Sequence, residues 1–203
     1  ERADVSVALQ MAGGDEIRIL ESAPRPIVLL EKVREIDGIS PGLDSYGIML
    51  PCTPLHFLLL QEIPVVVATS ANAREGPILK DEGEEVASLA DCVLAHNRPI
   101  ANRCDDSVVR VFRGRPLFLR RARGYVPDPL WLPGIRRQGR GSILALGAEM
   151  KNTVTLFKDD YLVTSQYLGD MKDVRNLAYL EEALQGLSDL YSTEPEVVCC
   201  DLH

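Results

Sequence analysis

The sequence contains no hydrophobic run long enough to cross a membrane. Its apolar stretches, such as residues 26–30 and 55–60, are far shorter than the roughly 20 residues that a spanning helix needs. No positively charged segment followed by an apolar one opens the chain, as a secretory signal would. We therefore expect a cytoplasmic protein with no membrane partner.

Cysteine is scarce and irregularly spaced. The five cysteines are an odd number, and no two of them have the C-x-x-C spacing of a zinc or redox site. Free thiols in a reducing compartment are therefore expected, rather than disulfides or a metal site. The adjacent pair Cys199 and Cys200 lies in a strand-like run, where neighbouring side chains face opposite sides, and we interpret it as structural.

Lysine is absent between residues 98 and 140, although arginine is abundant there. The segment has eleven arginines and three acidic residues, a net charge of +8, whereas the rest of the chain carries −16. Arginine is the preferred bidentate donor to phosphate and carboxylate groups, so the segment predicts an anion site. A solvated, salt-bridged hairpin is the alternative.

The pattern of apolar residues predicts an α/β protein. Alternating or β-branched runs bounded by Gly, Pro and Ser indicate strands, and residues 64–70 are the clearest of them. The expected helices are residues 54–61, 81–89 and 174–191. The expected strands are residues 25–30, 46–51, 64–70, 91–95, 107–112, 116–121, 142–148, 153–158, 161–165 and 196–201.

A change in composition predicts two domains. Proline, glycine and arginine dominate residues 127–141, so we assign residues 1–135 to one domain, 136–141 to a linker and 142–203 to a second domain. The chain begins without Met and ends directly after a strand pattern, so we expect it to be part of a longer protein. We also expect residues 142–203 to be an incomplete domain, with less protection from hydrogen exchange than residues 64–69.

Three groups of polar residues could carry chemistry, and the first follows the clearest strand. Thr69, Ser70 and Asn72 lie at its carboxyl end, where ligands bind in α/β sheets, although an ordinary Ser/Asn turn is the alternative. The third group is Lys151 and Asn152, in a turn between two strands that could hold phosphates, with residues 169–170 available for a metal ion nearby.

The second group flanks the predicted hairpin. Arg103, Asp106 and Ser107 precede or enter its first strand, and Arg121 ends its second. Arg120 and Arg121 alternate along that strand, so one of them would face a site and the other solvent. The alternative is that the acids only neutralise neighbouring arginines.

Eight short sequence motifs, taken in their order along the chain, are characteristic of one protein family. They are GIMLPCTPLH (47–56), TSAN (69–72), HNRPI (96–100), RCDDSV (103–108), RRARGYVP (120–127), ALGAEMKNT (145–153), SQYLGD (165–170) and CDLH (200–203). Together they resemble the hydrogenase maturation carbamoyltransferase family HypF over nearly the whole chain.

This resemblance implies a fold and a set of site residues. The first domain would be the C-terminal portion of a YrdC-like domain, a twisted, mostly parallel sheet with helices. The second would be the start of an actin-like (ribonuclease-H-like) fold, an incomplete β-β-β-α-β unit. The residues that the resemblance implies bind the nucleotide or carbamoyl-adenylate are Thr69, Ser70, Asn72, Arg103, Asp106, Ser107 and Arg121. Lys151 and Asn152 would bind phosphate in the second domain.

The resemblance also implies a reaction. The family makes carbamoyl-adenylate from carbamoyl phosphate and ATP, with Mg²⁺ expected, and releases pyrophosphate and later AMP. It then transfers the carbamoyl group to the C-terminal cysteine of HypE for cyanide ligand synthesis in [NiFe]-hydrogenase maturation. The family's acylphosphatase domain, zinc-binding cysteines and second-domain metal ligands are not in this sequence. The basic Lys/Arg segment that forms the other wall of the YrdC-type pocket is also absent, so we expect weak or no ATP binding by this stretch alone. Cys52 also stands where the family has an aromatic residue.

Two other functions remain open at this point. One is a YrdC-type tRNA threonylcarbamoyl-adenylate synthase or RNA-binding module, because four aromatic residues are interspersed in the basic segment. The acidic remainder of the chain makes a nucleic-acid partner the less favoured choice. The other is a docking surface for a protein partner. The four aromatic residues are Phe112, Phe118, Tyr125 and Trp131.

Overall fold

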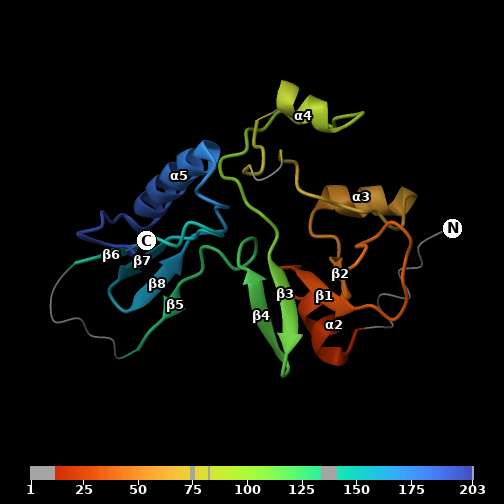
Figure 1. Cartoon of the computed structure of the whole chain (residues 1–203), viewed down its shortest axis with the longest axis horizontal. Helices are drawn as coiled ribbons and strands as arrows, with labels where there is room; N and C mark the ends of the chain where they lie inside the picture. The colour runs from red at the N-terminus through yellow and green to blue at the C-terminus, as the bar shows by residue number, and fades with distance from the viewer. Residues whose placement is uncertain (1–11, 74–75, 82, 134–140, 203) are drawn as a thin grey trace. The chain divides into compact units, whose positions relative to one another are not determined.

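A computed structural model describes residues 12–73, 76–81, 83–133 and 141–202 (Figure 1). Its contacts divide the chain into two compact units. Unit 1 comprises Glu1–Thr69 and Asp106–Tyr125, and unit 2 comprises Ser70–Asp105 and Val126–His203. The segment Ser70–Asp105, which the sequence assigns to the first domain, therefore makes its contacts within unit 2. The boundary near residue 135 stays a prediction.

Unit 1 is built on a four-stranded sheet in the order β2-β1-β3-β4. Strand β1 (Ile27–Glu31) pairs antiparallel with β2 (Ser45–Ile48) and parallel with β3 (Val108–Phe112). Strand β3 pairs antiparallel with β4 (Arg115–Arg120). The predicted α/β class is confirmed, and β1–β3 is the parallel pair among the described strands of this sheet.

The core of unit 1 follows from the alternation of side chains along its central strand. In β1, Val28 and Leu30 are buried, whereas their neighbours are partly exposed. Helix α2 (Gly14–Leu20) and Val109 of β3 complete this cluster. Each fully buried aliphatic side chain of this kind stabilises the fold by about 1.5–3 kcal/mol.

Two local predictions in unit 1 are confirmed. The β3–β4 hairpin turns through Arg113 and Gly114, whose φ angles of 51° and 73° are those of a two-residue type I′ turn. Helix α3 (Pro54–Glu62) begins where the sequence predicts it. Thr53 caps this helix, because its side-chain oxygen accepts a hydrogen bond from the His56 backbone N–H at 3.2 Å.

Unit 2 has a five-stranded sheet in the order β5-β8-β7-β6-β9. Strands β6, β7 and β8 form an antiparallel meander, and β9 joins parallel to β6 after helix α5. This confirms the expected β-β-β-α-β order, and β5, from the predicted boundary region, adds an unexpected edge strand. The bounds are β5 Leu130–Trp131, β6 Ile143–Ala145, β7 Thr155–Lys158, β8 Tyr161–Thr164, α5 Val174–Tyr191 and β9 Val197–Cys199.

Helix α5 covers one face of this sheet (Figure 1). It begins after Asp173, whose carboxylate caps the first turn. Tyr179 and Leu187 on its inner face pack into a cluster with Leu144 and Val163 from the sheet. Unit 2 therefore has a hydrophobic core of its own.

Two predicted strands do not form in the described part of the chain. Residues 64–70 and 91–95 are irregular, on either side of α4 (Glu84–Leu89). Their apolar side chains are exposed, with Val67 at 74% and Leu94 at 77%. Strand propensity is realised only where a partner strand lies alongside, and neither segment has one among the described residues. These strand predictions are therefore wrong for this structure.

This difference reverses the expected order of backbone protection. We expect the amides of residues 64–69 to exchange about tenfold or more faster than those of β7, which is hydrogen-bonded to β6 on one side and β8 on the other. Hydrogen–deuterium exchange followed by mass spectrometry would measure both. Slower exchange in residues 64–69 would mean that this segment has a partner strand in solution.

The described helices include none that is both long and apolar enough to span a membrane. None of the five cysteines, all of which lie in the described residues, is in a disulfide. Cys199 ends β9, and both Cys199 and Cys200 are exposed.

Candidate functional site

The first predicted group forms a turn that its own side chains hold. The Ser70 hydroxyl donates to Asn72 Oδ1 at 2.6 Å. Asn72 Nδ2 donates to the carbonyls of Ala73 at 3.0 Å and Gly76 at 3.2 Å. Ser70 and Asn72 belong to unit 2, whereas exposed Thr69 is the last residue of the first segment of unit 1. The geometry is that of a Ser/Asn turn, with the Ser70 hydroxyl on its exposed side.

Ser107 is completely buried, and its hydroxyl both donates a hydrogen bond to the backbone and accepts one from it. The hydroxyl donates to the Arg123 carbonyl at 2.9 Å and accepts from the Ala122 N–H at 2.8 Å. The Ser107 carbonyl accepts from the Ile27 N–H at 2.8 Å. Ser107 therefore joins β1, β3 and the segment after β4. Its predicted contact with an adenylate stays a prediction that rests on the resemblance.

Arg123 is the central arginine of unit 1, and the sequence did not single it out. Its Nε donates to Asp106 Oδ1 at 2.7 Å. Its two terminal nitrogens donate to the carbonyls of Pro24 and Arg25, each at 2.9 Å. Asp106 thus orients an arginine, as the alternative interpretation of the paired acids proposed. The string RRARG alone gives no signal that distinguishes Arg123 from its two neighbours.

Arg120 and Arg121 are not distinguished by exposure. Strand β4 ends at Arg120, so Arg121 lies just beyond it, and both side chains are half-buried. The alternation that would send them to opposite sides holds only within a regular strand. Which of the two would meet an anion therefore stays a prediction.

The third predicted group is brought together as expected. The Lys151 N–H donates to Asp170 Oδ1 at 2.7 Å, and Lys151 itself has a φ of 51°. The Asn152 N–H donates to the Gly169 carbonyl at 2.8 Å, and its Nδ2 donates to the Ala148 carbonyl at 2.6 Å. Asn152 is buried, and its Oδ1 has no hydrogen-bond partner. The backbone of Lys151 and Asn152 is thus held against Gly169 and Asp170, as the sequence predicts.

Arg103 belongs to unit 2, where its side chain is hydrogen-bonded to helix α5 and to the backbone of Ile78. Its Nη1 donates to Glu182 Oε2 of helix α5 at 2.5 Å, and its Nε donates to the Ile78 carbonyl at 2.9 Å. Only 16% of its side chain is exposed. Arg103 is therefore largely covered and paired with α5, and its predicted contact with a nucleotide stays a prediction.

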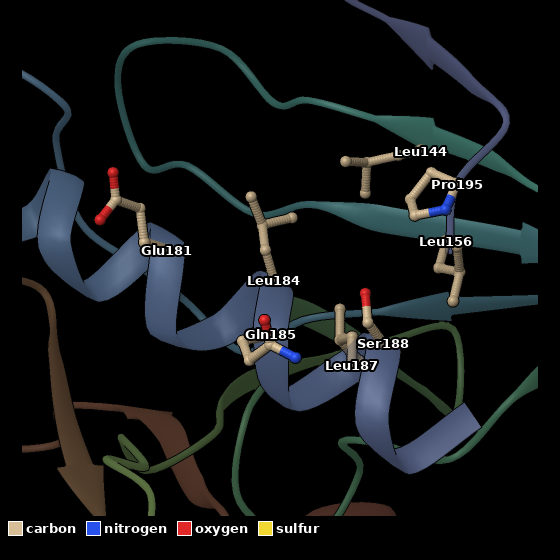
Figure 2. Close-up of a pocket in the computed structure, with 8 residues that line it drawn as sticks. All are labelled: Leu144, Leu156, Glu181, Leu184, Gln185, Leu187, Ser188 and Pro195. Carbon is tan, nitrogen blue, oxygen red and sulfur yellow. The ribbon is translucent and has the colours of Figure 1, made fainter. Parts of the chain in front are cut away.

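A separate groove runs between α5 and strands β6 and β7 (Figure 2). Its cavity volume is about 290 Å³. None of the predicted site residues lines it. The lining residues are Leu144, Leu156, Glu181, Leu184, Gln185, Leu187, Ser188 and Pro195.

Comparison with protein families gives a match to each half of the chain. The "HypF Kae1-like domain" model matches residues 138–203. The "Telomere recombination" model of the Sua5/YciO/YrdC family matches residues 4–122. The two matches together cover most of the sequence.

Individual relatives agree with these matches. The chain is 42% identical over 195 residues to carbamoyltransferase HypF of Synechocystis, covering 93% of this chain and 25% of that protein. It is 36% identical over 215 residues to carbamoyltransferase HypF of Rhizobium leguminosarum, covering 98% of this chain and 28% of that protein. The chain thus spans about a quarter of the length of the curated relatives it matches.

Solved structures show the same relationship. The crystal structure of full-length HypF in the phosphate- and nucleotide-bound form matches with a TM-score of 0.89 at 40% identity, over 98% of this chain and 32% of that one. The T. kodakarensis HypF structure matches with a TM-score of 0.88 at 34% identity, over 98% of this chain and 27% of that one.

Proposed function

This chain belongs to the HypF family of carbamoyltransferases, and we propose that it takes part in ATP-dependent carbamoyl transfer. In this proposal, carbamate derived from carbamoyl phosphate attacks the α-phosphate of ATP, pyrophosphate leaves, and carbamoyl-adenylate forms. The carbamoyl group then passes to the C-terminal cysteine thiol of HypE, with release of AMP.

The observation that carries the proposal is the succession of two regions in one chain. A YrdC-type region is followed directly by a HypF C-terminal-type region, at residues 4–122 and 138–203. An adenylate-forming region and a transfer region on one polypeptide suit a reaction in which a labile intermediate is made and then consumed. The similar structure in the phosphate- and nucleotide-bound form supports a nucleotide as ligand.

Adenylate formation needs no nucleophilic side chain. It needs hydrogen-bond donors fixed around the α-phosphate, where negative charge develops in the transition state. We propose that Arg121 supplies a charge-assisted pair of donors to the phosphate. Thr69, which is exposed and belongs to the same unit, would contribute a hydroxyl donor. The Ser70 hydroxyl and the Asn72 amide already donate within their own turn. Ser107 would act mainly through the backbone that its hydroxyl holds in place.

A second phosphate site is proposed at the turn of Lys151 and Asn152. The ammonium group of Lys151 is exposed and can approach a phosphate, and the buried Asn152 Oδ1 has an unused lone pair. Mg²⁺ fits this donor set, because it binds through one or two protein oxygens, waters and substrate phosphates. Asp170 and Asn152 would hold the ion, which would neutralise phosphate charge. Among the described residues no three His, Cys, Asp or Glu side chains cluster as a fuller metal site.

A nucleic-acid-binding function has less support from the geometry. Phe118 and Tyr125 pack edge to face with ring centroids 4.7 Å apart. Trp131 contacts Tyr161 in the same manner at 5.8 Å. Aromatic rings that pack against each other offer less surface for stacking on bases.

The proposal is tested by replacing one arginine of an adjacent pair. In the full-length gene product, Arg121→Ala is expected to lower carbamoyl-phosphate-dependent exchange of pyrophosphate into ATP by about 10²–10³-fold, because one donor to developing charge is lost. Hydrolysis of carbamoyl phosphate should be unchanged, because the family performs it in a separate domain.

Arg120→Ala is the matched control, since Arg120 has similar exposure and lies one residue away. It should retain most of the exchange activity. If Arg120→Ala were inactive and Arg121→Ala active, the assignment of the anion-binding arginine would be wrong. If the full-length gene product showed no exchange at all, the proposed reaction itself would be wrong.

A further inference from the structure

Helix α5 binds two basic side chains through one carboxylate. Glu182 Oε2 lies 2.5 Å from Arg103 Nη1 and 3.1 Å from Lys80 Nζ. The two basic side chains are largely covered, at 16% and 24% exposed. Nearby, Arg175 of the same helix lies 3.6 Å from Glu85 Oε1. Five charged side chains, three on the segment Ser70–Asp105 and two on α5, thus link the two.

Arg103 is held by its backbone as well as by its side chain. The Gln166 side-chain amide and the Tyr179 hydroxyl both donate to the Arg103 carbonyl. The Arg103 guanidinium lies over the Tyr179 ring, 5.2 Å from its centroid. An arginine with an ion pair, a cation–π contact and a fixed carbonyl has few alternative positions.

The protonation states favour this arrangement. Burial raises the pKa of Tyr179 well above its usual value, and the charge of Asp105 adds to the effect, so the hydroxyl remains a donor. Partial burial raises the pKa of Glu182, but hydrogen bonds from Lys80 and Arg103 outweigh it, and the net pKa is lowered. Glu182 is therefore a carboxylate at neutral pH.

The partners come from the two different family regions. Lys80 and Arg103 lie within the YrdC-type match at residues 4–122. Glu182, Gln166 and Tyr179 lie within the HypF C-terminal-type match. Two residues described above follow Arg103 closely along the chain. Asp106 orients Arg123, and Ser107 joins the strands of unit 1.

We propose that Glu182 is a positioning residue that anchors Arg103 to helix α5, so that the transfer region holds in place the part of the adenylate-forming region that carries Lys80 and Arg103. Arg103 then serves as the anchor rather than as a nucleotide ligand. Because Arg103 and Ser107 are four residues apart in the sequence, the anchor also limits the movement of the chain that leads to Ser107. The functional consequence rests on the proposed carbamoyl transfer, but the anchoring itself does not.

The test uses two adjacent glutamates of α5 in the full-length gene product. Glu182→Gln removes the charge that binds Lys80 and Arg103, whereas Glu181→Gln removes a charge at the groove between α5 and the sheet (Figure 2). We expect Glu182→Gln to speed hydrogen exchange in residues 76–81 and 83–105 by about tenfold, a fold-change equivalent to about 1.4 kcal/mol of local opening. Glu181→Gln should leave it unchanged. Unchanged exchange in Glu182→Gln, or equal effects of both substitutions, would overturn the proposal.

A double-mutant comparison separates anchoring from nucleotide contact. Arg103→Gln and Glu182→Gln should raise the KM for ATP by a similar factor of about three to ten, and the double variant should show no further increase, because both act through one contact. Loss of ATP binding in Arg103→Gln alone would make Arg103 a direct ligand and overturn the proposal. If ATP is not a substrate, the hydrogen-exchange result still decides whether the anchor exists.

Discussion

Replacing Arg123 with alanine is expected to destabilise unit 1 by about 2–4 kcal/mol. A hydrogen bond to a charged group is worth about 1.5–3 kcal/mol, and Arg123 donates to Asp106 and to two backbone carbonyls. Partial exposure, 28% for Arg123 and 38% for Asp106, keeps the total below the sum of three such bonds. The loss would appear as a lower midpoint of urea unfolding.

Arg115→Ala is a matched control for this experiment. Arg115 lies at the exposed start of β4, so its removal should change the free energy of unfolding by about 0.5 kcal/mol or less. Arg123→Lys should fall between the two, because an ammonium group cannot reach a carboxylate and two carbonyls in one planar fork. A stability for Arg123→Ala within about 0.5 kcal/mol of the parent would contradict the role assigned to its hydrogen bonds.

Elements with a local signal were predictable from the sequence. Helix α5 has the bounds that its apolar pattern predicts, and the structure adds that Asp173 caps it. The β3–β4 hairpin was predictable because Arg113-Gly114 suits a type I′ turn. Residues 64–70 and 91–95 were mispredicted, because strand formation depends on a partner that a single sequence pattern does not reveal.

The candidate site shows the same division. The association of the turn at residues 151–152 with residues 169–170 followed from the order of strands in a meander. The roles of Arg103 and Arg123 did not, because both depend on contacts made far along the chain, with Glu182 and with Pro24. The arginines of this segment cannot be told apart by their sequence context. They differ in the carbonyls and carboxylates that accept their hydrogen bonds.

Replacing Gly147 with alanine is expected to disrupt the turn that carries Lys151 and Asn152. A Cβ atom at Gly147 would lie 2.3 Å from the Thr153 carbonyl oxygen and 3.0 Å from its nitrogen. Both contacts are with backbone, so the two chain segments would have to separate. Overpacking of this kind costs about 1–3 kcal/mol, and a contact this short should reach the upper end. Urea unfolding would measure the loss.

Gly186→Ala provides a control of opposite sign. Gly186 lies in α5, where a Cβ would meet no atom within 4 Å. Alanine there should stabilise the protein by about 0.5–1 kcal/mol, because glycine is the poorer helix former. Gly147→Ala should also weaken ATP binding in the full-length gene product, since Asn152 Nδ2 would lie 3.1 Å from the new methyl group and would be displaced. Unchanged stability in Gly147→Ala would show that the backbone of this turn moves apart at little cost, and unchanged ATP affinity would place the phosphate site elsewhere.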